Sequence, residues 1–427
     1  MEIKAEAKKM KQSAPVLAAS TIEQRNQALD FIATALEQNK AEIFEANAKD
    51  MEYAESKQIA QSIQKRLKYD ENKLRDSISG VLELKELSDP IGKVLMHRQL
   101  DDGLILKKIS VPIGVIGVIF EARPDAMVQV ASLCIKSGNC AILKGGKETT
   151  NTNRVLFEII KNAVIKAGLP EQCLLQAEQH NEIDELLKCD SDVDLLIPRG
   201  SNQFVRYIME NTKIPVMGHS SGICHIYVDK DANREEALTV ILDAKKNYPA
   251  ACNAVETLLI HRDIATEFLP LLAAMFTEEN VKVNGTAEVQ KLMAMEVGIM
   301  QEEEFAMEYN DMEISIKLVS DVNEAIQHIN YFGSHHTDCI VTENDETAEF
   351  FVQMIDSAGV YHNCSTRFAD GFRYGFGAEV GISTGKLHAR GPVGLDGLVT
   401  YKYVLQGKGH IVGDYSSGKR KFKHKDL

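Results

Sequence analysis

The sequence predicts an α/β protein built from doubly wound parallel sheets. Two observations carry this prediction: short continuous apolar runs such as 113–120, and helical segments that alternate with them from there onward. A chain of 427 residues is long enough for two or three domains, and 44% hydrophobic and 26% charged residues are ordinary globular values. We therefore expect two α/β domains of similar size.

The first 90 residues differ from the rest, because apolar residues recur there at helical spacing among polar ones. We expect a packed helical layer over this stretch. Residues 90–110 change character, since Asp101-Asp102-Gly103 is a hairpin-type turn between two predicted strands, 94–100 and 104–109. A hairpin of this kind suggests a flap or an oligomer contact.

From residue 113 the expected elements alternate in type. The expected strands are 113–120, 140–144, 193–197, 223–228, 256–260, 338–342, 359–361 and 398–405. The expected helices are 124–136, 150–167, 202–211, 232–245, 264–275, 322–329 and 346–357. The last twenty residues hold six Lys/Arg and two Asp and are typical of a solvated tail.

Composition also excludes several classes of protein. The net charge of −14 argues against a nucleic-acid partner, and no apolar run approaches the roughly 18 residues of a membrane span. The start of the chain has no signal-peptide core. The eight cysteines include no CxxC pair, which indicates a reducing compartment. We therefore expect a cytoplasmic enzyme without membrane or nucleic-acid partners.

The Gly145-Gly146 turn follows a predicted strand and invites a phosphate-loop interpretation, which fails. Ala141 stands where the first glycine of GxxxxGK belongs, and Glu148 replaces the magnesium-binding hydroxyl. No GxGxxG occurs in the first domain either. Lys144 nevertheless ends the strand, and ligands of open α/β sheets bind at the carboxyl ends of strands. Ligand binding and plain solvation are equally favoured for Lys144.

Among the cysteines, Cys252 has the most distinctive setting. It lies in Tyr248–Asn253 between a predicted helix and strand, with small neighbours that leave room around the sulfur. This pattern makes it a candidate nucleophile, with a structural thiol as the alternative. The remaining cysteines lie in apolar runs or in polar segments without a comparable setting.

Two segments are candidate anion sites, and one histidine pair is not a candidate metal site. Arg199-Gly200-Ser201 lies at a strand-to-helix turn, and Ser383–Pro392 combines glycines and hydroxyls with Lys386, His388 and Arg390. Solvated loops are the alternative for both. Adjacent side chains in an extended chain point to opposite faces, so His335-His336 is interpreted as non-metal, and no metal site is expected.

Six blocks in order resemble the gamma-glutamyl phosphate reductase family of the aldehyde dehydrogenase superfamily. They are VPIGVIGVIFEARPDA from Val111, SGNCAILKGGKE from Ser137, LLIPRGSN from Leu195, YPAACNAVETLL from Tyr248, HNCSTRFADG from His362 and GAEVGISTGKLHARGPVGL from Gly377. The resemblance runs over nearly the full length and implies an aldehyde dehydrogenase-like fold. It implies NADPH-dependent reduction of L-glutamyl 5-phosphate to L-glutamate 5-semialdehyde through a cysteine thioester, in proline biosynthesis.

The resemblance also implies roles for individual residues. Cys252 falls on the nucleophile, and Lys144, Gly200, Ser201 and Glu308 fall on positions that contact NADP(H). The substrate's phosphate and α-carboxylate need cationic or N–H partners, and the candidates are Arg367, Ser365, Thr366, Lys386, His388, Arg390 and Arg123. Which of them meets which anion stays open.

Two departures from the superfamily pattern are informative. Gly218 stands where aldehyde dehydrogenases carry the glutamate that activates water, and its absence fits a reductase whose thioester must not hydrolyse. Glu121-Ala122-Arg123-Pro124 replaces the oxyanion asparagine, which leaves the Cys252 backbone N–H as one oxyanion donor and the second undecided. Ser201 and Cys364 differ from common relatives without removing a required group.

The resemblance finally predicts how the chain is divided. We expect a cofactor-binding domain at 1–95 and 112–222, a catalytic domain at 223–397, and an oligomerisation element with a tail at 96–111 and 398–427. A homo-oligomer and functional coupling to glutamate 5-kinase are implied. The alternatives are an acylating dehydrogenase that uses a coenzyme A thioester and a catalytically silent scaffold.

Overall fold

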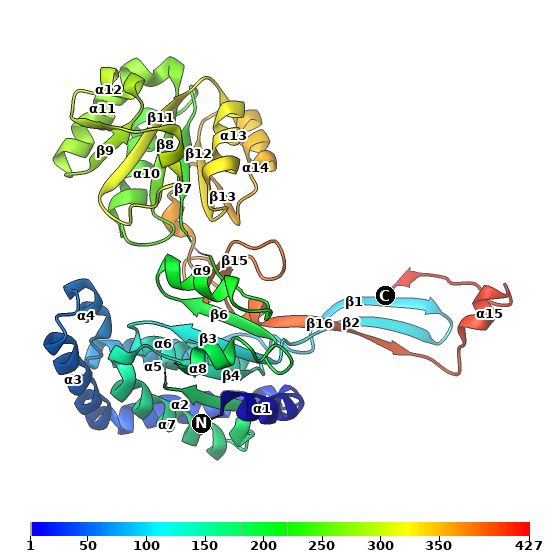
Figure 1. Cartoon of the computed structure of the whole chain (residues 1–427). Coiled ribbons are helices and arrows are strands. Elements are labelled where there is room, and N and C mark those ends of the chain that lie inside the picture. The colour runs from blue at the N-terminus through cyan, green and yellow to red at the C-terminus, as the bar shows by residue number, and fades with distance from the viewer. Residues whose placement is uncertain (1, 180, 220) are drawn as a thin grey trace. The chain divides into compact units, whose positions relative to one another are not determined.

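The computed structural model describes residues 2–179, 181–219 and 221–427, which form two compact units. The first unit comprises 1–217, 376–381 and 393–427, and the second comprises 218–375 and 382–392. Figure 1 shows both units with many of their helices and strands labelled. Among the described residues, no helix combines the length and apolarity that crossing a membrane requires.

Five helices form the first 86 residues, as the apolar spacing predicts. They are α1 (Ile3–Ala18), α2 (Ile22–Gln38), α3 (Lys40–Ser56), α4 (Gln61–Leu67) and α5 (Glu71–Glu86). Thr21 begins α2 with a capping box shared with Gln24, and Asp70 begins α5 by accepting the Lys73 N–H. Buried Ile, Leu and Ala residues give each long helix one apolar face.

The first unit has a parallel four-stranded sheet in the order β5-β4-β3-β6. Its strands are β3 (Val115–Phe120), β4 (Cys140–Lys144), β5 (Leu174–Ala177) and β6 (Leu195–Arg199). The helices between and after them are α6 (Pro124–Lys136), α7 (Thr150–Lys166), α8 (Asn181–Leu186) and α9 (Asn202–Glu210). Helices α2, α3 and α5 pack on α6 and α7, whereas α1 packs on β4 and α8.

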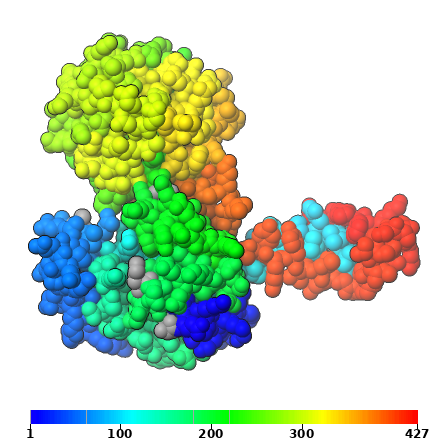
Figure 2. Space-filling model, viewed as in Figure 1, coloured from blue at the N-terminus to red at the C-terminus, as the bar shows by residue number. Residues whose placement is uncertain are grey.

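A separate four-stranded antiparallel sheet carries the predicted hairpin. It has the order β16-β2-β1-β17 and consists of β1 (Val94–Asp101), β2 (Leu104–Pro112), β16 (Val399–Gln406) and β17 (Lys425–Asp426). The short helix α15 (Val412–Ser416) lies between the last two. Figure 2 shows the C-terminal segment in red beside the cyan hairpin. The predicted tail is thus partly ordered, because β17 pairs with β1.

The second unit has a parallel seven-stranded sheet in the order β10-β9-β11-β8-β7-β12-β13. The strands are β7 (Cys224–Val228), β8 (Val255–His261), β9 (Lys282–Gly285), β10 (Val297–Ile299), β11 (Glu313–Val319), β12 (Thr337–Val341) and β13 (Gly359–His362). The helices are α10 (Arg234–Lys246), α11 (Ala265–Glu278), α12 (Ala287–Leu292), α13 (Val322–Phe332) and α14 (Asp345–Met354). The sheet is therefore doubly wound.

Two apolar cores cover the two faces of this sheet. One gathers residues of α10, α11 and α12, with Phe268 and Phe276 fully buried. The other gathers residues of α13 and α14 around Tyr227 and Phe351, whose rings stack. Two short strands, β14 (Gly381–Ser383) and β15 (Gly391–Val393), and the 3₁₀ turns 147–149, 171–173, 262–264, 302–306, 366–368 and 395–398 complete the described elements.

Candidate active site

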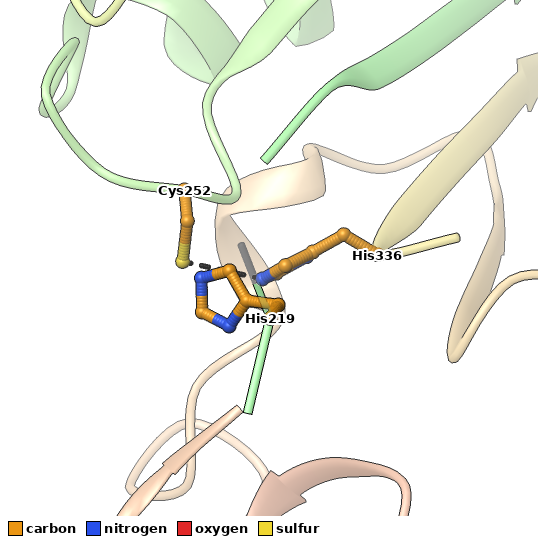
Figure 3. Close-up of side chains that lie close together, drawn as sticks. All are labelled: His219, Cys252 and His336. Atoms are coloured by element: carbon orange, nitrogen blue, oxygen red, sulfur yellow. Dashed lines mark hydrogen bonds between the residues drawn. The ribbon is translucent and has the colours of Figure 1, made fainter. Parts of the chain in front are cut away.

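Cys252 lies on the loop between α10 and β8, together with side chains from the loops before two neighbouring strands. His219 precedes β7 and His336 directly precedes β12, and the sheet order places β8, β7 and β12 side by side. The Sγ atom of Cys252 lies 3.2 Å from Nε2 of His336. Figure 3 shows both imidazoles directed at the sulfur. This cluster therefore lies at the amino edge of the sheet of the second unit.

The two histidines are held in place by their surroundings. His219 Nδ1 lies 2.8 Å from the Ile382 carbonyl oxygen, and His336 Nδ1 lies 2.9 Å from the Thr337 hydroxyl. The two rings meet edge to face, with centroids 5.0 Å apart. His336 is fully buried, whereas Cys252 is partly exposed and so remains accessible to a reactant.

Gly222 packs directly against the backbone of Cys252. A Cβ at this position would lie 2.1 Å from the Cys252 carbonyl oxygen and 2.5 Å from its Cα. Gly222, three residues after His219, thus lies against the Cys252 loop with no space for a side chain. Gly218, which stands where the water-activating glutamate is expected, directly precedes His219 and offers no carboxylate.

The predicted Ser365-Thr366-Arg367 segment contacts the Cys252 loop. Thr366 Oγ1 donates to the Asn253 carbonyl at 2.7 Å, and Asn253 Nδ2 donates to the Ala369 carbonyl at 2.8 Å. The Ser365 hydroxyl accepts the Arg367 N–H at 3.3 Å and begins the short turn. These hydrogen bonds through Asn253 help to hold the two segments together.

Arg367 is a buried cation on the segment that contacts the Cys252 loop. Its guanidinium donates to Oδ1 of Asn253 and, at 3.3 Å, to Oδ1 of Asn247. Both partners are neutral, and burial lowers the pKa of Arg367 below its usual value. These two amides do not neutralise the positive charge, and the side chains of Cys252, Asp370 and Asp243 interact with it electrostatically from nearby.

Lys386 and Arg390 differ from Arg367, because an acidic side chain already binds both. Lys386 Nζ lies 2.6 Å from one carboxylate oxygen of Asp356, and Arg390 lies 3.2 Å from the other. These two cations hold the pKa of Asp356 below its usual value. Strand β14, which precedes the loop that carries both cations, contacts the cluster through the Ile382 carbonyl that accepts from His219. His388 lies in the same loop.

Glu308 lies on a loop that is anchored to the start of β8. The Asn310 N–H donates to Glu256 at 3.2 Å, and Glu256 is ion-paired with Lys245 at 2.9 Å in a fully buried position. Burial raises the pKa of Glu256 to about 7, and the nearby charge of Glu308 adds to this effect. Glu308 therefore lies near the strand that begins three residues after Cys252.

Three of the four candidate cofactor residues, Lys144, Gly200 and Ser201, lie at the carboxyl edge of the sheet in the first unit, whereas Glu308 belongs to the second unit. Lys144 ends β4, is 3% exposed, and donates to the Gly145 carbonyl at 2.6 Å. Burial lowers the pKa of Lys144, and nearby glutamates oppose the effect. Gly200 and Ser201 follow β6, and the Ser201 hydroxyl caps α9 by accepting the Phe204 N–H.

Glu121 binds this turn from the neighbouring strand. Its carboxylate accepts the Ser201 N–H at 3.1 Å, and a Cβ on Gly200 would lie 2.5 Å from the same oxygen. Ala122, with φ +48°, follows it, and its N–H donates to Glu148 at 2.6 Å. Arg123 then precedes α6 and is half-buried. The residues present fit a nicotinamide cofactor, because a cation, a glycine turn and a helix start share one sheet edge.

Comparison with known proteins places the chain in a family. The model of the aldehyde dehydrogenase family matches residues 1–298. The chain is 49% identical over 427 residues to a gamma-glutamyl phosphate reductase of Acetivibrio thermocellus, covering 100% of this chain and 99% of that protein. A second relative of the same name, from Ruminiclostridium cellulolyticum, is 53% identical over 411 residues, with 96% and 95% covered.

The chain belongs to the gamma-glutamyl phosphate reductase family. The crystal structure of the Thermotoga maritima gamma-glutamyl phosphate reductase is similar to the structure of this chain, with a TM-score of 0.94, 38% sequence identity and 96% and 100% of the two chains covered. Family membership confirms the aldehyde dehydrogenase-like fold that the six sequence blocks imply, and it makes the chain an enzyme of the oxidoreductase class.

His219 and His336 are the residues that sequence reasoning missed. From the sequence alone, the adjacent His335-His336 is interpreted as non-metal, whereas the structure places His336 against Cys252, which lies 84 residues earlier in the chain. A signal was present in the sequence, because each residue stands shortly before an apolar strand. The order of the strands was needed to bring these positions together.

Proposed function

We propose that the chain reduces L-glutamyl 5-phosphate to L-glutamate 5-semialdehyde and phosphate with NADPH, with Cys252 as nucleophile. The observation that carries the proposal is the accessible Cys252 thiol with His336 Nε2 at 3.2 Å, in a chain of this family. We infer that the first unit binds NADP(H) through Lys144, Gly200 and Ser201, and that the second unit carries the chemistry. Glu308 is proposed as a further cofactor contact.

The first step forms a thioester on Cys252. The Sγ–H proton moves to His336 Nε2, sulfur attacks the γ-carbonyl carbon, and the C–O bond to phosphate breaks. The Cys252 backbone N–H supports the oxyanion. Arg367 attracts one of the two substrate anions, because the side chains that accept from its guanidinium among the described residues, Asn247 and Asn253, are neutral amides. Ser365, Thr366, Lys386, His388, Arg390 and Arg123 remain proposed substrate contacts.

The second step converts the thioester to the aldehyde. The cofactor, when bound, supplies a hydride. The resulting thiohemiacetal then breaks its C–S bond, which releases the semialdehyde and restores the Cys252 thiolate. His336 holds its proton for the returning sulfur. Gly218 presents no carboxylate to activate water, so the thioester survives until reduction.

Cellular context follows from this chemistry. An acyl phosphate hydrolyses readily, so we propose functional coupling to glutamate 5-kinase, which supplies the substrate in proline biosynthesis. All eight cysteines are free thiols, which fits a cytoplasmic location where Cys252 stays reduced. We further propose a homo-oligomer formed through the antiparallel sheet.

Replacement of Cys252 tests the proposal. The Cys252→Ala variant is expected to lose phosphate-dependent NADP⁺ reduction by glutamate 5-semialdehyde by about 10³-fold or more, because the covalent route is gone. Circular dichroism and cofactor binding should be unchanged. Cys364→Ser is the matched control, since Cys364 is another partly exposed thiol of the same unit. Activity near that of the parent in Cys252→Ala, or dependence on coenzyme A in place of phosphate, would overturn the proposal.

A further inference from the structure

The cluster around Cys252 combines three ligands that transition metals prefer. His219, Cys252 and His336 each offer one ligand atom, and these atoms all lie within 4.8 Å of one another. Tetrahedral zinc with Zn–N and Zn–S bonds of about 2.0–2.3 Å requires ligand atoms roughly 3.3–3.6 Å apart. The measured Nε2–Sγ distance of 3.2 Å is already close to this spacing. Small side-chain adjustments would therefore complete a three-ligand site.

The outer contacts of both histidines also match a metal site. A carbonyl oxygen can only accept, so the Ile382 oxygen at 2.8 Å places the ring proton of His219 on Nδ1. The lone pair is then on Nε2, the nitrogen that faces the sulfur in Figure 3. The Thr337 hydroxyl can orient His336 in the same way from 2.9 Å. Histidine ligands are typically held by such a second hydrogen bond.

The three loops that supply the ligands are fixed independently of any metal. They precede the adjacent strands β8, β7 and β12 of one parallel sheet, and Gly222 packs against the Cys252 backbone. The site is therefore built before a cation arrives. One thiolate and two imidazoles favour zinc-like cations over magnesium or calcium, which prefer oxygen ligands.

We propose that His219, Cys252 and His336 form a reversible binding site for Zn²⁺ or a similarly soft divalent cation. A cation bound there prevents the Cys252 sulfur from attacking the substrate. Binding replaces the thiol proton, which leaves to solvent, with an S–Zn bond, and water fills the fourth position. No electron transfer is involved, and a chelator restores the thiol. The inhibitory consequence rests on the proposed function, whereas the binding site itself does not.

Cobalt(II) provides a direct test of the site, because it reports thiolate coordination by its absorption. Titration of the full-length, reduced and metal-free protein with Co²⁺ should produce a sulfur-to-cobalt charge-transfer band and the visible bands of tetrahedral cobalt, and Zn²⁺ should abolish them. Cys252→Ser should lack the charge-transfer band. His219→Ala should weaken Zn²⁺ binding by about tenfold or more.

Two control variants test whether cysteines or histidines outside the cluster bind the added metal. Cys364→Ser and His335→Asn should retain the parent spectrum, since neither side chain belongs to the cluster. Asparagine is chosen because residue 335 has φ +59°. A charge-transfer band that persists in Cys252→Ser, or parent-like Zn²⁺ affinity in His219→Ala, would overturn the site.

Activity measurements separate the site from its consequence. Zn²⁺ should inhibit semialdehyde oxidation in the parent at the concentrations that displace cobalt, and His219→Ala should need about tenfold more Zn²⁺ for the same fractional inhibition. Full activity of the zinc-loaded protein would overturn the inhibitory role alone. A metal-free protein that is inactive toward the semialdehyde, yet shows the cobalt bands, would instead contradict the proposed function.

Discussion

At the scale of single residues, the local sequence indicates Cys252 as a candidate nucleophile but does not indicate the two histidines that lie beside it in the structure. Small neighbours and a helix-to-strand loop indicated accessible sulfur, and the YPAACN block made the residue specific. His219 and His336 can be recognised as part of the candidate site only because their loops contact the Cys252 loop in the folded chain. That contact follows from the order of strands in the sheet, which no local pattern encodes.

His328 is a residue whose burial has a measurable consequence for stability. It is 4% exposed, and its ring meets those of Phe305, Phe332 and His225. Lys317 Nζ lies 3.4 Å from its Nδ1, and its Nε2 has no partner among the described residues. Burial therefore lowers the pKa of His328 from 6.5 to about 2, and the charges of His225 and Lys317 add to this effect.

The lowered pKa predicts acid sensitivity. Below pH 6.5 the imidazole of residue 328 binds a proton in the unfolded chain, whereas in the folded state it stays neutral until the pH approaches 2. The contribution of His328 to the free energy of unfolding is therefore fully present above pH 6.5 and is lost as pH falls toward 2. Between pH 7.5 and 5.5, this one group should lower the free energy of unfolding by about 1.4 kcal/mol. In His328→Leu, the decrease over that interval should be smaller by this amount, as measured by urea unfolding followed by circular dichroism.

Lys317, which forms an ion pair with Glu302, faces His328. The contribution of this ion pair to the pH dependence of the free energy of unfolding must therefore be separated from that of His328. Glu302→Gln provides the control, because it removes that exposed charge and keeps the imidazole. Its pH dependence should remain close to that of the parent. An unchanged decrease in His328→Leu would show that His328 is not the group responsible.

At the scale of elements, helix α7 begins at a carboxylate supplied by α3. Asp50 is 2% exposed and accepts the N–H groups of Asn151 and Thr152 at 3.1 and 2.8 Å. It also accepts the Asn151 amide and the Thr152 hydroxyl at 2.9 and 2.6 Å. One buried anion therefore satisfies four donors at a helix N-terminus, where negative charge is favoured.

Asp50→Ala should therefore destabilise the first unit by about 3 kcal/mol or more, because buried donors lose a charged acceptor. The change in the urea midpoint measures this loss. Asp30→Ala is the matched control, since Asp30 is an exposed carboxylate whose ion pair with Lys85 contributes at most about 1 kcal/mol. Equal effects of the two substitutions would contradict the capping role.

Elements with strong local signals were predictable, and those fixed by tertiary pairing were not. Helix 124–136 and strand 140–144 have the predicted bounds, because proline, glycine and a continuous apolar run mark their ends. The strand expected at 193–197 lies at Leu195–Arg199, where pairing with β3 sets its register. Strands β5, β9, β10 and β11 were missed, since three of them are short and several contain polar residues.

The rule that ligands bind at the carboxyl ends of strands locates candidate site residues in the first unit but not the Cys252 cluster of the second. Lys144 and the Gly200-Ser201 turn lie at carboxyl ends of β4 and β6. Cys252, His219 and His336 instead precede β8, β7 and β12. Sequence reasoning that searches only carboxyl ends therefore finds the candidate cofactor residues and overlooks the histidines of the candidate active site.

At the scale of the whole molecule, the antiparallel sheet has a free edge in the described part of the chain. Strand β16 is paired with β2 along its length, and it is the outermost strand of its sheet. One face of β16 carries an exposed apolar side chain at every second position. These side chains are Tyr401, Tyr403 and Leu405, which are 49%, 58% and 55% exposed. An unprotected edge with apolar side chains is typical of strands that pair with another chain.

The double substitution Tyr403→Lys with Leu405→Lys is expected to weaken the proposed homo-oligomer. Two ammonium groups on β16 would be desolvated on pairing and would repel their copies in a symmetric partner, so dissociation should shift to a higher protein concentration by about tenfold or more. Analytical ultracentrifugation over a dilution series measures the shift. Tyr331→Lys is the matched control, because Tyr331 is 80% exposed on α13 and outside this sheet. If the double variant sediments like the parent at every concentration, subunits do not associate through β16, and another surface must carry the oligomer.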